Sequence, residues 1–261
     1  IVILCVGLDE TLEGEEGDTG NSYASGDKET LQLPQVQLDL MEAMAESGKP
    51  VVLCLMAGSD IDLSYAEEHF DAVMVLWYPG AEGGKAAARV LFGDVSPSGK
   101  LPVTFYNTLE ELPDFTDYAM KGRTYRYMTE NPLFPFGHGL SYTTFQYGNA
   151  SLNTSEIKDG EQVTLTIPVS NTGKYDGEEV VQVYLRHPGD KEGPSHALRA
   201  FKRVAIAKGA TNNVTIPLSK ENFEWFDTST NTMRPIEGDY EILYGGTSEL
   251  KQLKSIPVTI K

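Results

Sequence analysis

The run IVILCVG (residues 1–7) decides the first part of the fold, because it is continuously apolar and rich in β-branched residues. Such a run is typical of a strand that is buried on both faces in a parallel sheet. The same signature predicts three further strands, at residues 51–58, 71–77 and 101–106. Helical stretches are predicted between them, at residues 33–50, 64–70 and 81–93. This alternation predicts an α/β sandwich over residues 1–107, with a mostly parallel sheet flanked by helices.

The pattern changes after residue 145, where strand-length stretches follow one another without a helix-length segment. We therefore expect residues 145–261 to form a β-sandwich of about seven strands, of the immunoglobulin or fibronectin type III kind. Between the two parts, residues 108–144 are rich in aromatic residues and proline. This composition favours an ordered connector packed on both domains over a flexible linker. The predicted fold class is thus α/β plus all-β.

Composition and charge argue against several classes of protein. The chain has 261 residues, of which 40% are hydrophobic, and a formal net charge of −17. This charge argues against nucleic acid or an anionic membrane as a partner, because both attract basic surfaces. No apolar stretch reaches the roughly 18 to 20 residues that span a bilayer. Cys5 and Cys54 lie in apolar runs, and we expect both to be buried in the core.

The chain opens inside an apolar run, without an initiator methionine and without the pattern of a signal peptide. We therefore expect a piece of a longer protein, whose α/β domain is incomplete at its N-terminus. The sequence leaves a periplasmic, a secreted and a cytoplasmic location open.

The first predicted strand leads into an acidic stretch, LEGEEGD (residues 12–18), which places four carboxylates within six positions. It lies beyond the carboxyl end of a strand, where parallel sheets bind their ligands. A solvated surface loop explains the stretch without any function, and its oxygen atoms also suit a hard cation. In a third interpretation, neighbouring charges or burial raise the pKa of one glutamate, which then acts as a general acid. The residues alone leave these three alternatives open.

Other kinds of site find less support in the sequence. Gly7, Gly14 and Gly17 lack the spacing of a dinucleotide-binding loop, and the acidic stretch would repel a pyrophosphate. The four histidines show no spacing typical of zinc ligands. Ser59 and Ser141 lack the G-x-S-x-G context of a nucleophilic serine. We therefore expect neither a cofactor nor a metal ion.

Several longer motifs make the sequence resemble a known family. They are GLDETLEGEEGD (residues 7–18), LWYPGAEGGKAAARVLFGDVSPSGKLPVTFY (76–106), PFGHGLSYTTF (135–145) and NTGKYDGEEVVQVYLRH (171–187). The first three resemble the C-terminal part of family 3 glycoside hydrolases, and the last resembles the fibronectin type III-like domain of that family. Within the family the sequence is most similar to bacterial β-xylosidases, with β-glucosidases as the alternative. A non-catalytic carbohydrate-binding or structural module is the alternative from another class.

The resemblance implies a retaining exo-glycosidase that removes terminal β-linked sugars from oligosaccharides or aryl β-glycosides. It assigns the general acid/base to Glu15, with Glu16 as the runner-up. Glu13 and Trp77 are candidate substrate contacts. Trp77 ends a predicted strand on the same side as the acidic stretch, and an aromatic residue of the core or its rim is the alternative interpretation. The nucleophile is expected on a TIM-like barrel domain that this sequence lacks, in cis or on a partner chain. We therefore expect the chain to be inactive by itself.

One position departs from the family pattern. Lys28 stands where relatives usually have arginine, and lysine keeps the charge but loses the bidentate fork of a guanidinium. If this residue only anchors the acidic stretch electrostatically, the change is mild. If it clamps a carboxylate, the order of the loop is affected.

Overall fold

The computed structural model describes residues 1–9, 12–13, 28, 30–158 and 161–261. The chain divides into two compact units. Unit 1 comprises residues 1–94, 105–118 and 132–134, and unit 2 comprises residues 95–104, 119–131 and 135–261. The domain boundaries expected after residues 107 and 144 stay a prediction. No helix within the described ranges is long and apolar enough to cross a membrane.

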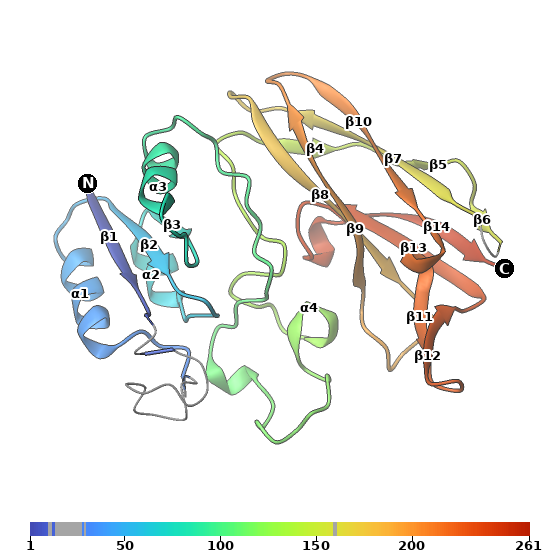
Figure 1. Ribbon diagram of the computed structural model, residues 1–261, viewed down its shortest axis with the longest axis horizontal. Coiled ribbons are helices and arrows are strands. Elements are labelled where there is room, and N and C mark those ends of the chain that lie inside the picture. Colours follow the sequence, from blue (N-terminus) through green and yellow to red (C-terminus); the bar gives the residue numbers. More distant parts are fainter. Residues whose placement is uncertain (10–11, 14–27, 29, 159–160) are drawn as a thin grey trace. The chain divides into compact units, whose positions relative to one another are not determined.

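Unit 1 contains a small parallel sheet with α-helices beside it (Figure 1). Its elements are β1 (Val2–Gly7), α1 (Gln35–Ala45), β2 (Val51–Met56), α2 (Ser64–His69), β3 (Ala72–Val75), α3 (Gly83–Leu91) and the 3-10 helix η2 (Leu109–Glu111). The strands pair in parallel in the order β1-β2-β3. The alternation of strand and helix predicted from the apolar runs is confirmed for the first six of these elements.

Strand β1 is buried on one face only. Leu4 and Val6 are 5% and 4% exposed, whereas Ile3 is 48% exposed and Cys5 is exposed as well. Cys54 in the central strand β2 is buried as expected. The predictions of a doubly buried strand at residues 1–7 and of a buried Cys5 are therefore wrong. Successive side chains of a strand point to opposite faces, and in β1 only the face that carries Leu4 and Val6 is covered.

Residues 101–106 do not form the predicted fourth strand. The segment instead makes an isolated antiparallel bridge, in which the Phe105 N–H donates to the Phe134 carbonyl at 2.9 Å. Pro102 interrupts the run, because proline has no N–H to donate to a ladder. Phe105 is nevertheless fully buried and meets Phe134 edge-on, with 6.3 Å between the ring centres. The apolar run is thus a core segment without a strand.

Unit 2 consists mainly of strands (Figure 1). Its elements are α4 (Thr124–Tyr127), β4 (Phe145–Tyr147), β5 (Ser151–Leu152), β6 (Glu156–Ile157), β7 (Val163–Asn171), β8 (Gly177–Arg186), β9 (Ala197–Ile206), β10 (Thr211–Leu218), η3 (Lys220–Phe223), β11 (Glu224–Asp227), β12 (Thr232–Pro235), β13 (Gly238–Gly245), η4 (Leu250–Gln252) and β14 (Lys254–Ile260). One sheet has the order β10-β7-β4, with β5 also on β7, and the other has the order β6-β14-β13-β8-β9.

The two larger sheets of unit 2 contribute to one hydrophobic core. Strand β7 shows the pattern clearly, since Val163, Leu165, Ile167 and Val169 are fully buried and the residues between them are partly exposed. This arrangement confirms the predicted β-sandwich. The described part of unit 2 has eleven strands instead of about seven. The excess arises because strands as short as β5 and β6, with two residues each, leave no alternation in the sequence.

The strands of unit 2 pair mostly in antiparallel fashion, although β14 and β6 are parallel. The expectation of a mostly parallel sheet therefore holds for the small sheet of unit 1 and is wrong for the chain as a whole. The fold class is mixed α/β, in which strands dominate and helices are few.

Aromatic side chains of the connector are packed within unit 2. Tyr125 stacks on Phe136 with 4.6 Å between the ring centres and meets Tyr184 edge-on at 5.8 Å. The Tyr125 hydroxyl accepts a hydrogen bond from the Leu198 N–H at 3.0 Å. These contacts bind the connector segment 119–131 to the β-sandwich.

We predict that Gly7→Ala destabilises unit 1, because a Cβ at this position would lie 1.8 Å from the Met56 carbonyl oxygen on β2. Relieving such an overlap costs about 1–3 kcal/mol or more. Gly84→Ala is the matched control, since a Cβ there meets nothing within 4 Å and alanine favours the helix. Thermal unfolding followed by circular dichroism should show a lower midpoint for Gly7→Ala and no loss for Gly84→Ala. A wild-type midpoint for Gly7→Ala would contradict the close packing of β1 on β2.

Candidate functional site

The carboxyl ends of the three parallel strands meet at one edge of the sheet in unit 1. Gly7 at the end of β1 lies opposite Met56 at the end of β2, and Leu55 lies opposite Val75 at the end of β3. Open parallel sheets bind their ligands at this edge. The segments that leave the strands there are residues 8–9, 57–60 and 76–80.

Glu13 is held at this edge through both of its carboxylate oxygens. Ser59 Oγ donates a short hydrogen bond to Oε1, and the Tyr78 hydroxyl donates to Oε2 at 3.4 Å. A turn fixes the backbone, because the Glu13 N–H donates to the Asp9 carbonyl at 2.9 Å. We call the side chains of Glu13, Ser59 and Tyr78 the Glu13 clasp. The clasp ties the start of the acidic stretch to the loops that follow β2 and β3.

Neighbouring residues restrict both the Tyr78 ring of the Glu13 clasp and the end of β1. A Cβ at Gly58 would lie 2.7 Å from the Tyr78 ring, so a larger residue there would displace the ring that reaches Glu13. On the side of β1, the Gln37 side chain accepts a hydrogen bond from the Gly7 N–H at 2.9 Å and donates one to the Gly7 carbonyl at 2.8 Å. Helix α1 therefore fixes the strand end from which the acidic stretch departs.

Lys28 lies close to the Glu13 clasp. Its Nζ donates a hydrogen bond to the main-chain carbonyl of Asp60 at 2.7 Å. Burial lowers the pKa of Lys28, and the negative charges of Glu13 and Asp60 partly offset this effect. The hydrogen bond goes to a carbonyl, for which a single ammonium is sufficient. This contact fits the alternative in which Lys28 anchors the segment without clamping a carboxylate, and the effect of lysine in place of arginine stays a prediction.

Asp60 is a carboxylate in a perturbed environment. Burial raises its pKa to about 6, although the Tyr106 N–H, which donates to Oδ2 at 3.0 Å, and the charge of Lys28 both act in the opposite direction. The other oxygen, Oδ1, is buried and has no hydrogen-bond partner among the described residues. Such a carboxyl group remains protonated into the mildly acidic range.

Trp77 has a left-handed backbone, with φ at 55°. For a bulky residue this conformation costs roughly 1–3 kcal/mol and persists only where the surroundings impose it. The side chain is half-buried and meets the buried Phe105 edge-on, with 6.2 Å between the ring centres. The backbone strain therefore accompanies a turn that packs Trp77 on Phe105 while the next residue, Tyr78, reaches Glu13.

The residues singled out from the sequence fall into two groups. Glu15 and Glu16 lie outside the described residues. Glu13 and Trp77 both belong to segments at the carboxyl edge of the sheet, and Tyr78 links them because it follows Trp77 and bonds to Glu13.

Three other residues at this edge were not identified in their observed roles. The sequence places Ser59 and Tyr78 beyond the carboxyl ends of predicted strands, where ligands bind, but it does not predict that they hold Glu13, and it does not indicate Asp60 as a site residue. Ser59 and Tyr78 lie 46 and 65 positions away from Glu13, and no sequence pattern pairs residues over such separations. Their place directly after predicted strands was the available signal.

The described residues contain no group of three or more His, Cys, Asp or Glu side chains that is arranged to hold a metal ion. His196 illustrates a structural role. It is buried, and its ring nitrogens lie 2.8 Å from Ser195 Oγ and 2.9 Å from the Ser248 carbonyl. Burial lowers the pKa of His196 to about 4, so the ring is neutral near pH 7.

Two known protein families match this chain, one in each part of the sequence. Residues 1–142 match the glycosyl hydrolase family 3 C-terminal domain, and residues 179–248 match the fibronectin type III-like domain. These matches confirm the resemblance inferred from the motifs.

Individual relatives and solved structures agree with these matches. A xylan 1,4-beta-xylosidase of Xylanibacter ruminicola is 46% identical over 260 residues, which cover 99% of this chain and 30% of the relative. A periplasmic beta-glucosidase of Salmonella typhimurium is 34% identical over 80% of this chain and 29% of its own length. The structure of a beta-glucosidase from Listeria innocua in complex with glucose superposes with a TM-score of 0.82 and 29% identity, over 99% of this chain and 36% of the other. The chain thus spans about a third of the length of these relatives.

The surroundings of Asp60 give a testable pH dependence. Its pKa is about 6 in the folded protein and near 3.8 ordinarily, so the folded state holds the proton more tightly than the unfolded state. The stabilisation that this proton provides is complete below about pH 4 and is lost as the pH rises through 6. We therefore predict that Asp60→Asn, which cannot ionise, gains stability relative to the wild type between pH 4 and pH 7.

Urea unfolding of both proteins at pH 4 and pH 7 measures this difference. Asp94→Asn, at an exposed aspartate, controls for the loss of one negative charge. Stability differences between Asp60→Asn and the wild type that are equal at the two pH values would contradict the raised pKa.

Proposed function

The chain belongs to glycosyl hydrolase family 3, whose C-terminal domain its residues 1–142 match, and we propose that it supplies the general acid/base of a retaining, exo-acting glycoside hydrolase. The proposed substrate is an oligosaccharide or aryl glycoside with a terminal β-linked sugar. A β-D-xyloside is the first candidate, because the relative with 46% identity is named a xylan 1,4-beta-xylosidase. The proposed role is in the breakdown of plant polysaccharides such as xylan.

The family match assigns the role of Glu15, and the structural observation that supports the proposal is the Glu13 clasp. Ser59 and Tyr78 hold both oxygens of Glu13, and the proposed acid, Glu15, follows only two positions later. The clasp therefore constrains where the acidic stretch begins, at the edge of the sheet where ligands bind. We assign Glu13 a positioning role and keep Glu13 and Trp77 as proposed sugar contacts.

In the proposed mechanism Glu15 acts twice. In the first step a nucleophilic carboxylate attacks the anomeric carbon, the glycosidic C–O bond breaks, and protonated Glu15 gives its proton to the departing oxygen. In the second step ionised Glu15 takes a proton from water, the water oxygen attacks the anomeric carbon, and the bond to the nucleophile breaks. The sugar leaves with its β configuration retained. Glu16 is the alternative to Glu15 in this role.

The nucleophile is proposed to lie outside these 261 residues, on a barrel domain in cis or on a partner chain. Retaining enzymes hold their two carboxyl groups about 5 Å apart, so the acidic stretch provides one half of the centre. The chain by itself is then inactive, and its activity is a property of the complete enzyme.

We predict that Glu15→Gln in the full-length protein lowers turnover of xylobiose by about 10²–10⁴-fold, the usual contribution of a general acid. The loss should be smaller for aryl xylosides with activated leaving groups, which need little protonation. Added azide should restore part of the activity on such substrates, because it attacks the intermediate without a general base. Steady-state kinetics on xylobiose and nitrophenyl xyloside measure all three effects.

Two further variants distinguish the proposed acid from the Glu13 clasp that positions it. If Glu15 is the acid, Glu16→Gln should retain most of the activity on xylobiose. If Glu16 is the acid, Glu16→Gln should show the large loss and Glu15→Gln should retain most of the activity. Ser59→Ala removes one hydrogen bond of the Glu13 clasp, so it should lower turnover moderately, and azide should not rescue it. Near-normal turnover of xylobiose by both glutamine variants would exclude the acidic stretch as the acid/base.

β-Glucosides are the second candidate substrate, because relatives of 30–35% identity include several named beta-glucosidases. The ratio of kcat/KM for nitrophenyl xyloside and nitrophenyl glucoside decides between the two sugars. A ratio above one supports the xyloside, and a ratio below one supports the glucoside.

A further inference from the structure

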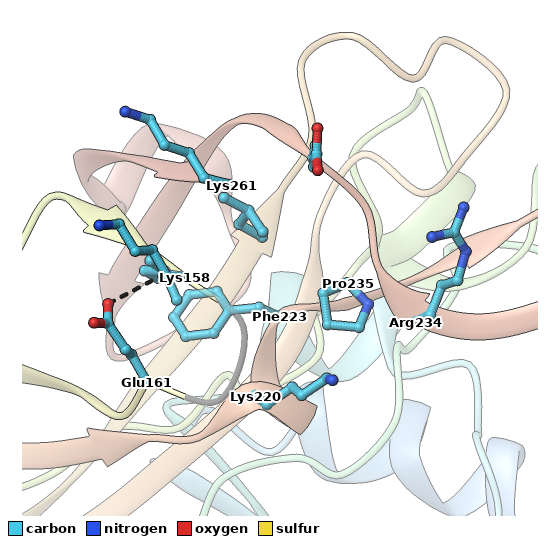
Figure 2. Close-up of a pocket in the computed structure, with 10 residues that line it drawn as sticks. Lys158, Glu161, Lys220, Phe223, Arg234, Pro235 and Lys261 are labelled. Atoms are coloured by element: carbon cyan, nitrogen blue, oxygen red, sulfur yellow. Dashed lines mark hydrogen bonds between the residues drawn. The ribbon is translucent and has the colours of Figure 1, made fainter.

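Two hollows of unit 2 differ in how their cationic side chains are paired. The smaller has a volume of about 280 Å³ and is shown in Figure 2. Arg234 Nε donates there to Asp227 Oδ2 at 2.6 Å, and Lys261 Nζ lies 2.7 Å from Glu156 Oε1, so both charges are already neutralised. Its aromatic residue, Phe223, is 2% exposed and offers no free ring face. We infer no ligand for this smaller hollow.

The larger hollow lies between strands β9 and β10, each of which ends one of the two larger sheets. Its volume is about 640 Å³, and residues 198–202 of β9 and 216–217 of β10 line it. This volume falls within the roughly 300–1,000 Å³ of small-molecule sites. All of the lining residues belong to unit 2. We call it the β9–β10 hollow.

The β9–β10 hollow has an exposed aromatic ring. Phe201 lines it and is 67% exposed. Ala200 and Val204 pack against the core of the β-sandwich, and successive side chains of a strand point to opposite faces, so Phe201 points away from that core. The buried Ile216 and the exposed Pro217 add apolar surface from β10. A free ring face of this kind can receive the flat apolar side of a ligand.

Two cationic residues, Arg199 and Lys202, also line the β9–β10 hollow. Arg199 Nη2 donates to the main-chain carbonyl of Glu224 at 2.6 Å, and Lys202 Nζ donates to that of Thr215 at 3.0 Å. Among the described residues, no carboxylate oxygen lies within 4.0 Å of either cation. A carbonyl carries no net charge, so these hydrogen bonds hold the two side chains without neutralising them. This distinguishes them from Arg234 and Lys261.

The surroundings of Arg199 favour an anion. Its Nε is buried, as is that of Arg126, and neither nitrogen has a hydrogen-bond partner in the part of the chain that the structure describes. Burial lowers the pKa of Arg199, and the positive charge of Arg126 lowers it further, while the charge of Glu224 acts in the opposite direction. A guanidinium that is partly removed from water and faces a second one is stabilised when a carboxylate pairs with it.

We infer that the β9–β10 hollow binds a small carboxylate whose ring has an apolar face. Arg199 and Lys202 would receive the carboxylate, for which the guanidinium fork offers two parallel donors, and the ring would rest on Phe201. A neutral ligand would leave both positive charges without a counter-ion. A long polyanion is disfavoured because the chain as a whole has a net charge of −17.

Sugar acids and aromatic acids share this chemistry, since both combine a carboxylate with a ring that can lie on Phe201. The inference does not depend on the proposed hydrolysis, because it uses residues of unit 2 and requires neither Glu15 nor the Glu13 clasp. Failure of one proposal therefore leaves the other intact.

Isothermal titration of the full-length protein at low salt tests the inference. The probes are glucuronate and benzoate, the neutral amide of each, and acetate, which has the carboxylate without a ring. The titrations are repeated with Lys202→Gln and Phe201→Ala, two exposed positions at which a change should leave the fold intact, as thermal unfolding checks. Lys208→Gln is the matched control, since Lys208 is exposed and does not line the hollow.

Glucuronate or benzoate should bind at least tenfold more tightly than its amide and than acetate, and the acid that does so identifies the kind of ring. Lys202→Gln and Phe201→Ala should each weaken this binding at least threefold, whereas Lys208→Gln should leave it unchanged. Raising the salt concentration should weaken it as well, because Lys202 is solvent-exposed.

Equal affinity for each acid and its amide, acetate binding as tight as that of the ring acids, or wild-type affinity in both variants would overturn the inference. Hydrolysis of nitrophenyl xyloside by Phe201→Ala and Lys202→Gln should remain at the wild-type level, which separates this test from that of Glu15.

Discussion

The parallel pairing of β1 with β2 is the constraint on which the candidate site depends. The register that sets Gly7 opposite Met56 brings the loop after β1 next to the loop after β2, and the pairing of β2 with β3 adds a third loop. Gly7 is required because the two backbones approach too closely there for a side chain. Without this register, Glu13, Ser59 and Tyr78 would belong to three unrelated segments. The chemistry at the edge is thus a consequence of backbone pairing.

Two carboxyl groups at this edge, those of Glu13 and Asp60, are accommodated in different ways. Glu13 is neutralised in part by hydrogen bonds from Ser59 and Tyr78, and Lys28 contributes a positive charge close by. Asp60 is accommodated differently, since burial keeps it protonated to about pH 6. These contacts lower the cost of placing the carboxyl groups of Glu13 and Asp60 at this edge. In the proposed mechanism a later glutamate of the stretch is the proton donor.

The sequence predicts those features that depend on local pattern. The first three strands and the helices between them follow from apolar runs and helical spacing, and the core of unit 2 follows from alternation in strands such as β7. Residues 101–106 have the composition of a strand, but Pro102 lacks the N–H that a ladder needs. The exposure of Cys5 depends on which face of β1 the rest of the chain covers, and a continuous apolar run does not indicate this. The Glu13 clasp depends on contacts over 46 and 65 residues, which no local pattern encodes. The role of Glu15 rests on family resemblance.

The central claim is that this chain provides the proton donor while another part of the enzyme provides the nucleophile. Trapping the covalent intermediate tests it directly. The full-length protein is treated with a 2-deoxy-2-fluoro-xylosyl fluoride, digested, and mapped by mass spectrometry. We predict a single labelled carboxylate outside these 261 residues, with the peptide that contains Glu15 and Glu16 unlabelled. A label on Glu15, Glu16 or any other residue of this chain would contradict it.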